Sequence, residues 1–565
     1  MFLRSIEKRN GESGIVLIVC LVILLMLSLI GIASITTSNT DLELAGNEMD
    51  KTGSFYAAEA GLEKAMSALV TSYQTTGAPP YPLPYEFLTM EGYSYYYWAE
   101  DNGPAAMKVL DVGSYTGLYG LAKTFEVSSL GYDNDYEIGV RLEQGLEDAV
   151  IPLFQFAIFY EGNLEFSPGP DMVMDGRVHA NGDVYLQSST NLYLNSRLTS
   201  GGSLFHGDMP ASGFGTLSGN VFISDDAGTY QNMRNIDGTF LDSDDPSWIT
   251  ESLSRWGGQV EDVNHGITDL NMQVVASGNS TDLIDRGDQS VDSYEHDAGL
   301  RFVDGQALYR NFDGSWLDVT AAWTGAGVIT PGAFQDQRES QSVQSLDIDM
   351  DLLNASGYFP PNGVIYASLP ASGTLNGVRL INGSALNSGL TIATNNPIYV
   401  QGDYNTINQQ PAALVSDAIT VLSNNWDDGN SGLGLPNRMA TQTTINASVV
   451  TGIVPSANGN YSGGFENLIR YMEDWSGIDF NWKGSAISLW ESRQATSQWN
   501  NRYYSAPNRN FVFDRSLLDP LGLPPEAPKV NVVLRTSWNQ TILYDYRRYY
   551  EQLEHGLPEI GDTIP

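Results

Sequence analysis

The chain has 565 residues, with 28 lysines and arginines, 67 aspartates and glutamates and a formal charge of −39. A surface this acidic repels nucleic-acid phosphates, so binding of DNA or RNA is not expected. Cys20 is the only cysteine, which excludes a disulfide within the chain. At this length a core can form without one.

An uncharged apolar run, residues 15–33, lies near the N-terminus and reads IVLIVCLVILLMLSLIGIA. A helix of this length extends about 28 Å, close to the thickness of a bilayer hydrocarbon core. Arg4, Lys8 and Arg9 precede it, which favours a cytoplasmic N-terminus. No small-residue cleavage pattern of a secretory signal follows the run. We therefore expect one transmembrane segment at residues 15–33.

Residues 34–72 predict a continuation of the same helix. Leu42, Ala45 and Met49 recur at three- and four-residue steps, and no proline interrupts the pattern. The prolines of residues 77–84 end it, because consecutive prolines cannot continue a helix. An ordinary surface helix that packs on its own domain is the alternative.

The segment 44–65, LAGNEMDKTGSFYAAEAGLEKA, resembles the N-terminal region of PilX-type minor pilins in the type IV pilin superfamily. The matching positions are Phe55, Tyr56, Ala58, Glu59, Ala60 and Gly61. The resemblance covers roughly the first seventy residues. It implies a basic leader, residues 1–14, that a prepilin peptidase removes after Gly14 to leave Ile15 as the mature N-terminus.

Major pilins place a glutamate at the fifth mature position, where this chain has Val19. A carboxylate in an apolar run costs several kcal/mol in lipid unless it finds a partner, such as the terminal amine of a neighbouring subunit. Val19 removes both the cost and the device that sets register. The resemblance therefore implies a minor subunit, with a plain uncleaved membrane anchor as the alternative.

Residues 85–150 predict a small antiparallel sheet. The runs YSYYYWAE, MKVLDVG, TFEVSSLG and YEIGVRLE are aromatic or β-branched and are separated by turn signals. In the last run, Tyr136, Ile138, Val140 and Leu142 alternate with charged residues, as in a half-buried strand. A long helix followed by a four-stranded sheet resembles a pilin head.

Residues 151–545 are too many for a pilin head and predict a large, mainly β extracytoplasmic body, followed by a tail at 546–565. Short apolar runs cut by Gly, Asn and Ser recur from Leu164 to Phe205 and again from 363 to 454. This spacing favours a β-solenoid, with a β-sandwich as the alternative. The fold class is therefore mainly β with a long N-terminal helix.

Residues 210–350 predict an insertion into the body, with helices and irregular loops. A second helical insertion is expected at 463–475, GGFENLIRYMEDW, where apolar residues fall on one helical face. The pieces VHANGDVYL and PIYVQGDYN resemble an uncharacterised extracytoplasmic domain of large PilX-type proteins. That resemblance implies a class of protein and no particular chemistry.

Chemical motifs are few, and no catalytic residues are expected. The sequence has no close histidine pair for a metal, no GxSxG and no phosphate-binding loop. His179, in GRVHANGD near Asp183, is more typical of a structural hydrogen-bond donor than of a base.

Calcium is the one cofactor weighed, because it takes six to eight oxygen ligands from loops rich in Asp, Asn and Gly. Its best candidate loop contains Asp242, Asp244 and Asp245. The segment 347–351, DIDMD, would place three aspartates on one face of a strand, which suits a solvated face as well as a cation site.

These observations predict a non-enzymatic minor pilin of a type IV pilus or related pseudopilus, at the filament tip or in priming. Its partners would be other minor pilins, the major pilin, the prepilin peptidase, the assembly machinery and the inner membrane. The body would lie in the periplasm or, after assembly, on the pilus or cell surface. A pilus-tip or membrane-anchored adhesin for a surface or glycan is the alternative. A membrane-anchored carbohydrate-active enzyme is a third reading, because paired carboxylates can cleave glycosides.

Processing at Gly14 can be tested by N-terminal sequencing. Cleavage on the cytoplasmic side would leave Ile15 first, carrying a methylated amine. We expect Gly14→Val to block cleavage and to hold the chain in the inner membrane. Recovery of Met1 from the wild-type chain would contradict this prediction.

Overall fold

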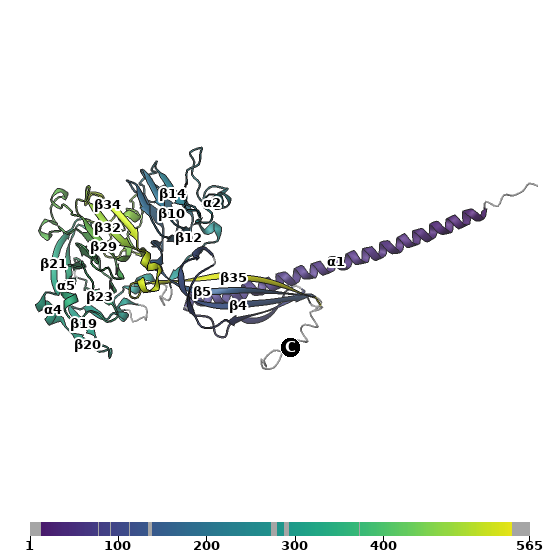
Figure 1. Ribbon diagram of the computed structural model, residues 1–565, viewed down its shortest axis with the longest axis horizontal. Coiled ribbons are helices and arrows are strands. Elements are labelled where there is room, and N and C mark those ends of the chain that lie inside the picture. The colour runs from purple at the N-terminus through teal and green to yellow at the C-terminus, as the bar shows by residue number, and fades with distance from the viewer. Residues whose placement is uncertain are drawn as a thin grey trace, which may run out of the picture.

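A long helix, a head sheet and a β-rich body follow one another along the molecule (Figure 1). The computed structural model describes residues 13–76, 78–90, 92–111, 113–133, 138–272, 279–287, 293–371 and 373–544. Leader residues 1–12, Tyr136 and the tail at 546–565 therefore lie outside the described residues.

The helix α1 (Ser13–Thr76) has 64 residues and a length of about 96 Å. It joins the apolar run 15–33 to the segment 34–72 without a break, so the predicted continuous helix is confirmed. Between Ile15 and Tyr73 it contains a window apolar enough, in a helix long enough, to cross a membrane, and that window is not buried. Figure 1 shows this half projecting from the molecule.

The head is a seven-stranded antiparallel sheet in the order β1-β2-β4-β5-β35-β17, with β3 paired to β4. Its strands are β1 (Tyr85–Met90), β2 (Tyr93–Asp101), β3 (Ala106–Val109), β4 (Tyr119–Asp133), β5 (Ile138–Pro152), β17 (Asn271–Met272) and β35 (Lys529–Tyr544).

The last strand of the sheet, β35, comes from the C-terminal end of the described chain. It pairs with β5 from Lys529 opposite Pro152 to Tyr544 opposite Ile138. The sequence-based division had placed this segment in the body, because a pairing between strands so far apart in sequence leaves no local signal. The body, residues 153–528, is thus inserted between two neighbouring strands, and its ends meet where the Leu153 N–H donates to the Pro528 carbonyl (2.8 Å).

The C-terminal half of α1 packs on the face of the sheet formed by β2, β4 and β5. Small residues allow the close approach: at Gly131 in β4, a Cβ atom would overlap the Ser54 carbonyl oxygen and the Ala58 nitrogen of α1. The buried side chains of this core are Ala57, Ala58, Leu62, Ala65, Met66, Leu69, Tyr73, Tyr95, Tyr97, Ala99, Phe125, Val127, Val140, Leu142 and Leu146.

The body begins with coils whose strands stack in parallel. Ile158, Val178 and Leu198 stand in one register, each twenty residues from the next. We call these coils the N-terminal stack. Its strands are β6 (Ile158–Tyr160), β7 (Leu164–Phe166), β8 (Met172–Met174), β9 (Val178–Ala180), β10 (Val184–Leu186), β11 (Asn191–Leu194), β12 (Leu198–Ser200), β13 (Leu204–His206) and β14 (Asn220–Ser224).

A second set of parallel coils, the C-terminal stack, completes the body. Its strands are β18 (Leu300–Val303), β22 (Gln341–Asp349), β23 (Val364–Ser368), β24 (Leu375–Ile381), β25 (Leu390–Thr394), β26 (Ile398–Gln401), β27 (Ala412–Ser416), β28 (Ile419–Leu422), β29 (Thr443–Asn446), β30 (Ser448–Ile453), β31 (Ile469–Tyr471), β32 (Asp479–Gly484), β33 (Ala486–Glu491) and β34 (Asn508–Phe513). The two stacks join where β33 pairs in parallel with β6, so one twelve-stranded sheet runs through both. Parallel stacking is what a β-solenoid requires, whereas the sheets of a sandwich are antiparallel.

The region 210–350, predicted as an insertion, is only partly one, because β14, β18 and β22 of the stacks lie within it. It contributes β15 (Tyr230–Asn232), β16 (Val260–Glu261), β19 (Gln306–Arg310), β20 (Trp316–Asp318) and β21 (Ile329–Asp336) to sheets of the body. The helices of the body are α2 (Trp248–Trp256), α3 (Tyr294–Asp297), α4 (Thr320–Ala326) and α5 (Met350–Ala355).

Two local predictions are wrong. The segment 463–475 forms a short 3-10 turn, Phe465–Asn467, and then strand β31, because its apolar residues complete a coil beside β28. Asp347, Asp349 and Asp351 do not share a strand face. β22 ends at Asp349, whose side chain caps α5 by accepting the Leu352 N–H (3.0 Å), and Asp351 lies in that helix.

Gly131→Ala should weaken the packing of α1 against the head sheet. The added methyl meets helix backbone, which cannot move aside as a flexible side chain can, so we expect a loss of about 1–3 kcal/mol. Amide hydrogen exchange of β4 and of residues 54–66 would measure it in detergent. Gly46→Ala is the matched control, since a Cβ there meets nothing within 4 Å and favours the helix. Equal protection in both variants would contradict the close packing.

Candidate functional site

The first candidate site is the free half of α1. Its apolar side chains from Ile15 to Ile35 are exposed, and Val19 among them is 50% exposed. Cys20 is also exposed in this segment. An unburied apolar helix of this length needs either lipid or other apolar helices around it. With Val19 in place of a glutamate, the segment offers no carboxylate there for pairing with a neighbouring chain.

The sequence motif from Phe55 to Gly61 is divided between two faces of the helix. Ala58 and Gly61 are buried on the sheet, where Gly61 lies against Tyr95 and Ser129. The half-buried residues Phe55 and Ala60 lie at the edge of the same core. Tyr56 and Glu59 point away from it and are exposed. The motif thus seats the helix with small residues and leaves a tyrosine and a glutamate on the outside.

A bidentate ion pair connects α1 to the C-terminal strand. Arg535 of β35 donates from Nη1 and Nη2 to the two carboxylate oxygens of Glu63 (2.6 and 2.7 Å). The hydrogen bonds from Arg535 lower the pKa of Glu63, and those to Glu63 raise the pKa of Arg535. Both side chains are about half exposed, so solvent screening leaves the pair worth about 1 kcal/mol or less. It adds a direct contact between β35 and the helix, while the pairing with β5 sets the position of the strand.

The N-terminal region can be placed by comparison with known proteins. A family described as PilX N-terminal matches residues 13–63, which include the free half of α1 and the seated motif. The chain carries a PilX-type N-terminal segment. The resemblance inferred from residues 44–65 is thereby confirmed.

One solved structure similar to this chain is the crystal structure of the competence-associated pilin ComZ from Thermus thermophilus. The identity is 11% and the TM-score 0.24, over 88% of this chain and 98% of that one. At so low a TM-score the likeness carries no weight for the fold. No curated protein sequence matches the chain.

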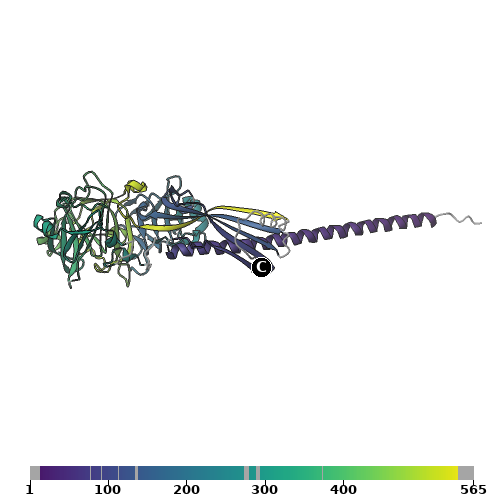
Figure 2. The same ribbon diagram turned by 90° about the horizontal axis from the view of Figure 1, so that it is seen from below.

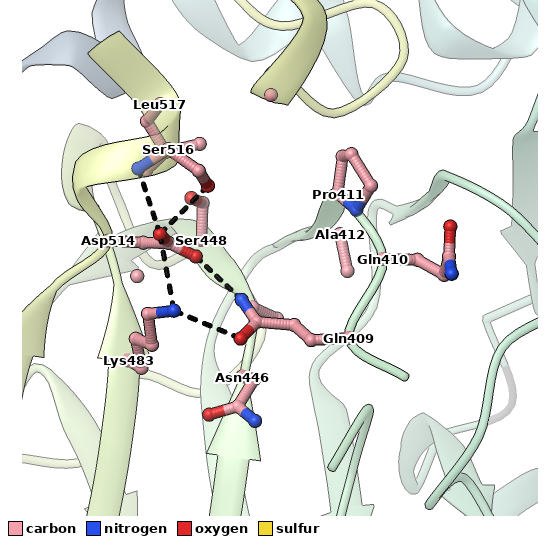
Figure 3. A pocket seen from close by; sticks show the side chains of 13 residues that line it. Gln409, Gln410, Pro411, Ala412, Asn446, Ser448, Lys483, Asp514, Ser516 and Leu517 are labelled. Atoms are coloured by element: carbon pink, nitrogen blue, oxygen red, sulfur yellow. Dashed lines mark hydrogen bonds and ion pairs between the residues drawn. The ribbon is translucent and has the colours of Figure 1, made fainter. Parts of the chain in front are cut away.

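A second candidate site is a cavity of about 290 Å³ in the body. It lies between loops of the C-terminal stack and the segment that leads to β35 (Figure 3). Lys483 donates to the Gln409 side-chain oxygen (3.0 Å), and Gln409 in turn donates to Asp514 (2.6 Å). Lys483, Gln409 and Asp514 therefore already pair with one another. Its full lining is Gln409, Gln410, Pro411, Ala412, Asn446, Ala447, Ser448, Lys483, Gly484, Asp514, Ser516, Leu517 and Gly522.

Asp514 is the anionic group of this cavity. Burial acts to raise its pKa, but hydrogen bonds from Ser516, the nearby Lys483 ammonium and Gln409 outweigh that effect and lower the pKa. Lys483 lies 3.4 Å from Asp514 and balances its charge. The site is thus a small, nearly neutral polar hollow, and among the residues that line it no aromatic ring offers a stacking surface for a sugar.

The aspartates weighed as calcium ligands serve the local backbone. Asp242 accepts the N–H groups of His206 (3.1 Å) and Asp244 (3.2 Å), and Asp245 accepts the N–H and hydroxyl of Ser247. Within the described part of the chain, no group of three or more His, Cys, Asp and Glu side chains is arranged to hold a metal. Calcium at this loop stays a prediction.

His179 is fully buried in strand β9. Its Nδ1 lies 2.8 Å from the Thr199 hydroxyl and its Nε2 lies 3.0 Å from the Asn181 side-chain oxygen. Burial lowers its pKa to about 4, so the ring is neutral near pH 7. These contacts connect neighbouring coils, and Asp183 is not one of its partners.

Buried carboxylates gather where the two stacks meet. Glu165 of β7 accepts the hydroxyls of Ser456 (2.6 Å) and Ser462 (2.7 Å), and Glu466 accepts the Ser167 N–H (3.2 Å). Burial raises the pKa of both, that of Glu466 to about 7. A pair of carboxylates for glycoside cleavage must reach a sugar chain. These two are buried hydrogen-bond acceptors at the junction and do not line the cavity.

Sequence reasoning missed β35 and its ion pair, since nothing near Arg535 points to Glu63. It also missed the twenty-residue coil, for which a signal exists. Residues 158–177 and 178–197 align without a gap, with glycines at 162 and 182 and arginines at 177 and 197. A comparison of the sequence with itself at that offset would have found the repeat.

The buried carboxylates make stability depend on pH. The pKa of Glu466 is about 7 in the folded chain and near 4.5 when unfolded, so between these values the folded state holds a proton that the unfolded state releases. Its contribution is full at low pH and is lost as pH rises towards 7. We expect wild type to lose roughly 2–3 kcal/mol relative to Glu466→Gln between about pH 5 and about pH 8.

Urea unfolding at a series of pH values measures this difference. The exposed Glu251 of α2 provides the matched control, and Glu251→Gln should leave the pH profile of the wild type unchanged. Parallel profiles for wild type and Glu466→Gln would show that the carboxylate is solvated.

Proposed function

We propose that this chain is a minor subunit of a type IV pilus or a related pseudopilus, positioned at the filament end or in the priming complex. One observation carries the proposal: α1 is a single helix whose first half is free and whose second half is seated on the head. The PilX-type match over residues 13–63 covers both parts.

The free half of α1 has two suitable environments, the inner membrane before assembly and the helices of other subunits afterwards. Side chains that are apolar on all sides of a helix suit either environment. The partners we propose are other minor pilins, the major pilin, the inner-membrane assembly machinery and, for the leader, the prepilin peptidase. The head and body would lie outside the cytoplasm.

The size and position of the body favour a filament end. Figure 2 shows the head between the free half of α1 and the much wider body. Helices that pack side by side in a filament are only about 10 Å apart. Copies of this chain stacked at such spacing would collide through their bodies. Val19 also removes the carboxylate that would set register between successive copies.

The copy number of the chain tests the end position. We expect quantitative mass spectrometry of sheared filaments to find this chain at a small fraction of the major subunit. A ratio approaching one to one would rule out the end position, and absence from filaments of the processed chain would rule out the pilus assignment itself.

A further inference from the structure

One sequence unit occurs twice in the body. Residues 234–242 read RNIDGTFLD and residues 310–318 read RNFDGSWLD, so six of nine positions are identical. Each unit is followed by a short helix, α2 or α4, and each helix ends at a glycine with a left-handed backbone, Gly257 or Gly327.

The two units fold into the same hairpin turn. Asn235 N–H donates to the Thr239 carbonyl in the first (2.8 Å), and Asn311 N–H donates to the Ser315 carbonyl in the second (2.8 Å). In both, the aspartate carboxylate accepts the N–H (3.0 Å) and hydroxyl (2.6 Å) of the Thr or Ser two residues later.

The position after each aspartate requires glycine. Gly238 has a φ of 90° and Gly314 a φ of 84°, which other residues rarely adopt. Ahead of them, Ile236 and Phe312 are the tips of the two hairpins, and their side chains are 108% and 95% exposed.

The aromatic residue two places after the glycine of each unit has a cationic partner. Phe240 lies under the Arg234 guanidinium (4.5 Å) and stacks on His206 (3.3 Å between ring centroids). Trp316 lies under the Arg301 guanidinium (4.4 Å). These contacts cover ring faces and pack each hairpin against the coil beside it. The covered ring faces are therefore not free to stack on a ligand.

The first unit and the strands on either side of it cover all three sheets at the outer end of the N-terminal stack. β15 pairs antiparallel with β14, and β16 pairs with β12. Between them Ser243 donates its N–H to the Leu204 carbonyl of β13 (2.8 Å) and accepts the Leu204 N–H on its hydroxyl (2.7 Å). Asp242 accepts the next free N–H of β13, from His206 (3.1 Å).

The second unit and the strands around it cover the outer end of the C-terminal stack. β19 pairs antiparallel with β18, and β20 follows on β19. After α4, β21 pairs antiparallel with β22. Figure 1 shows α4, β19 and β20 on the side of the body opposite α2 and β14.

Stack ends of this kind can pair with one another, because the inner ends already do so where β33 joins β6 in parallel. An open sheet edge is a template for another chain, and repeat proteins need terminal caps to stay soluble. We infer that the two RNxDG units are duplicated caps, which prevent the outer ends of the body from pairing with a second copy of this chain. This role does not depend on the pilus assignment.

The test opens one cap or both in the full chain in detergent. Gly238→Val and Gly314→Val each force a β-branched residue into the left-handed turn. Light scattering after size exclusion should show wild type as a monomer and each single variant at up to twice that mass, because one open end can join only one other. The double variant should form longer chains that grow with concentration, with its β circular dichroism retained.

Two controls accompany these variants. Gly477→Val carries the same strain outside both caps (φ 71°), and Phe312→Ser changes an exposed tip without touching the turn hydrogen bonds. Both should stay monomeric. A folded double variant at monomer mass, or equal association of Gly477→Val, would overturn the inference. If Gly238→Val fails to fold, the pair Asp242→Ala with Ser243→Ala removes the side-chain acceptors of the Leu204 and His206 N–H groups of β13, and a monomer there would be equally decisive.

Discussion

β5 and β35 pair along nearly their whole length, although the entire body separates them in the sequence. The two ends of the segment between them meet, because the Leu153 N–H donates to the Pro528 carbonyl at the base of the body. For a flexible chain the entropic cost of closure grows only slowly with length, by about 0.6 kcal/mol per doubling. Here the folded body holds its own ends together. The helix, the head sheet and the body are therefore structurally interdependent. The head sheet lacks β35 until the body, which precedes β35 in the chain, has formed.

Within the body, polar side chains repeat with the coils and satisfy the backbone at their corners. The Asn163 side chain accepts the Asp183 N–H, and the Asp183 carboxylate accepts the Ser203 N–H one coil later. Much of the acidic excess of the chain lies in turns of this kind, where aspartates accept nearby N–H groups. The net negative charge therefore has a structural origin, in addition to disfavouring anionic partners. An aspartate that accepts backbone N–H groups at such a turn does not need a cation to account for its position.

The sequence predicted what depends on local pattern. The apolar run, the uninterrupted helix and the alternating strands of the head follow from the periodicity of neighbouring residues. Pairings between distant segments could not be obtained in that way. Nothing around Lys529–Tyr544 indicates β5, and the segment 463–475 has the spacing of a helix, yet the coil beside β28 requires it as a strand. The hydrogen bond between Asp242 and the His206 N–H likewise joins residues distant in sequence and could not be predicted from either segment alone.

The connections that follow β5 and precede β35 leave the sheet at the same end, where Pro152 and Lys529 lie opposite each other and β17 pairs beside them. A pull along α1 would therefore reach the body through two adjacent strands at once and load them lengthwise. The hydrogen bonds between β4, β5 and β35 would then share the force in shear, instead of opening one at a time from a free end. A body held by two adjacent strands would transmit tension directly to the head sheet. A body on a single flexible linker would first reorient and would bear load only once the linker was extended.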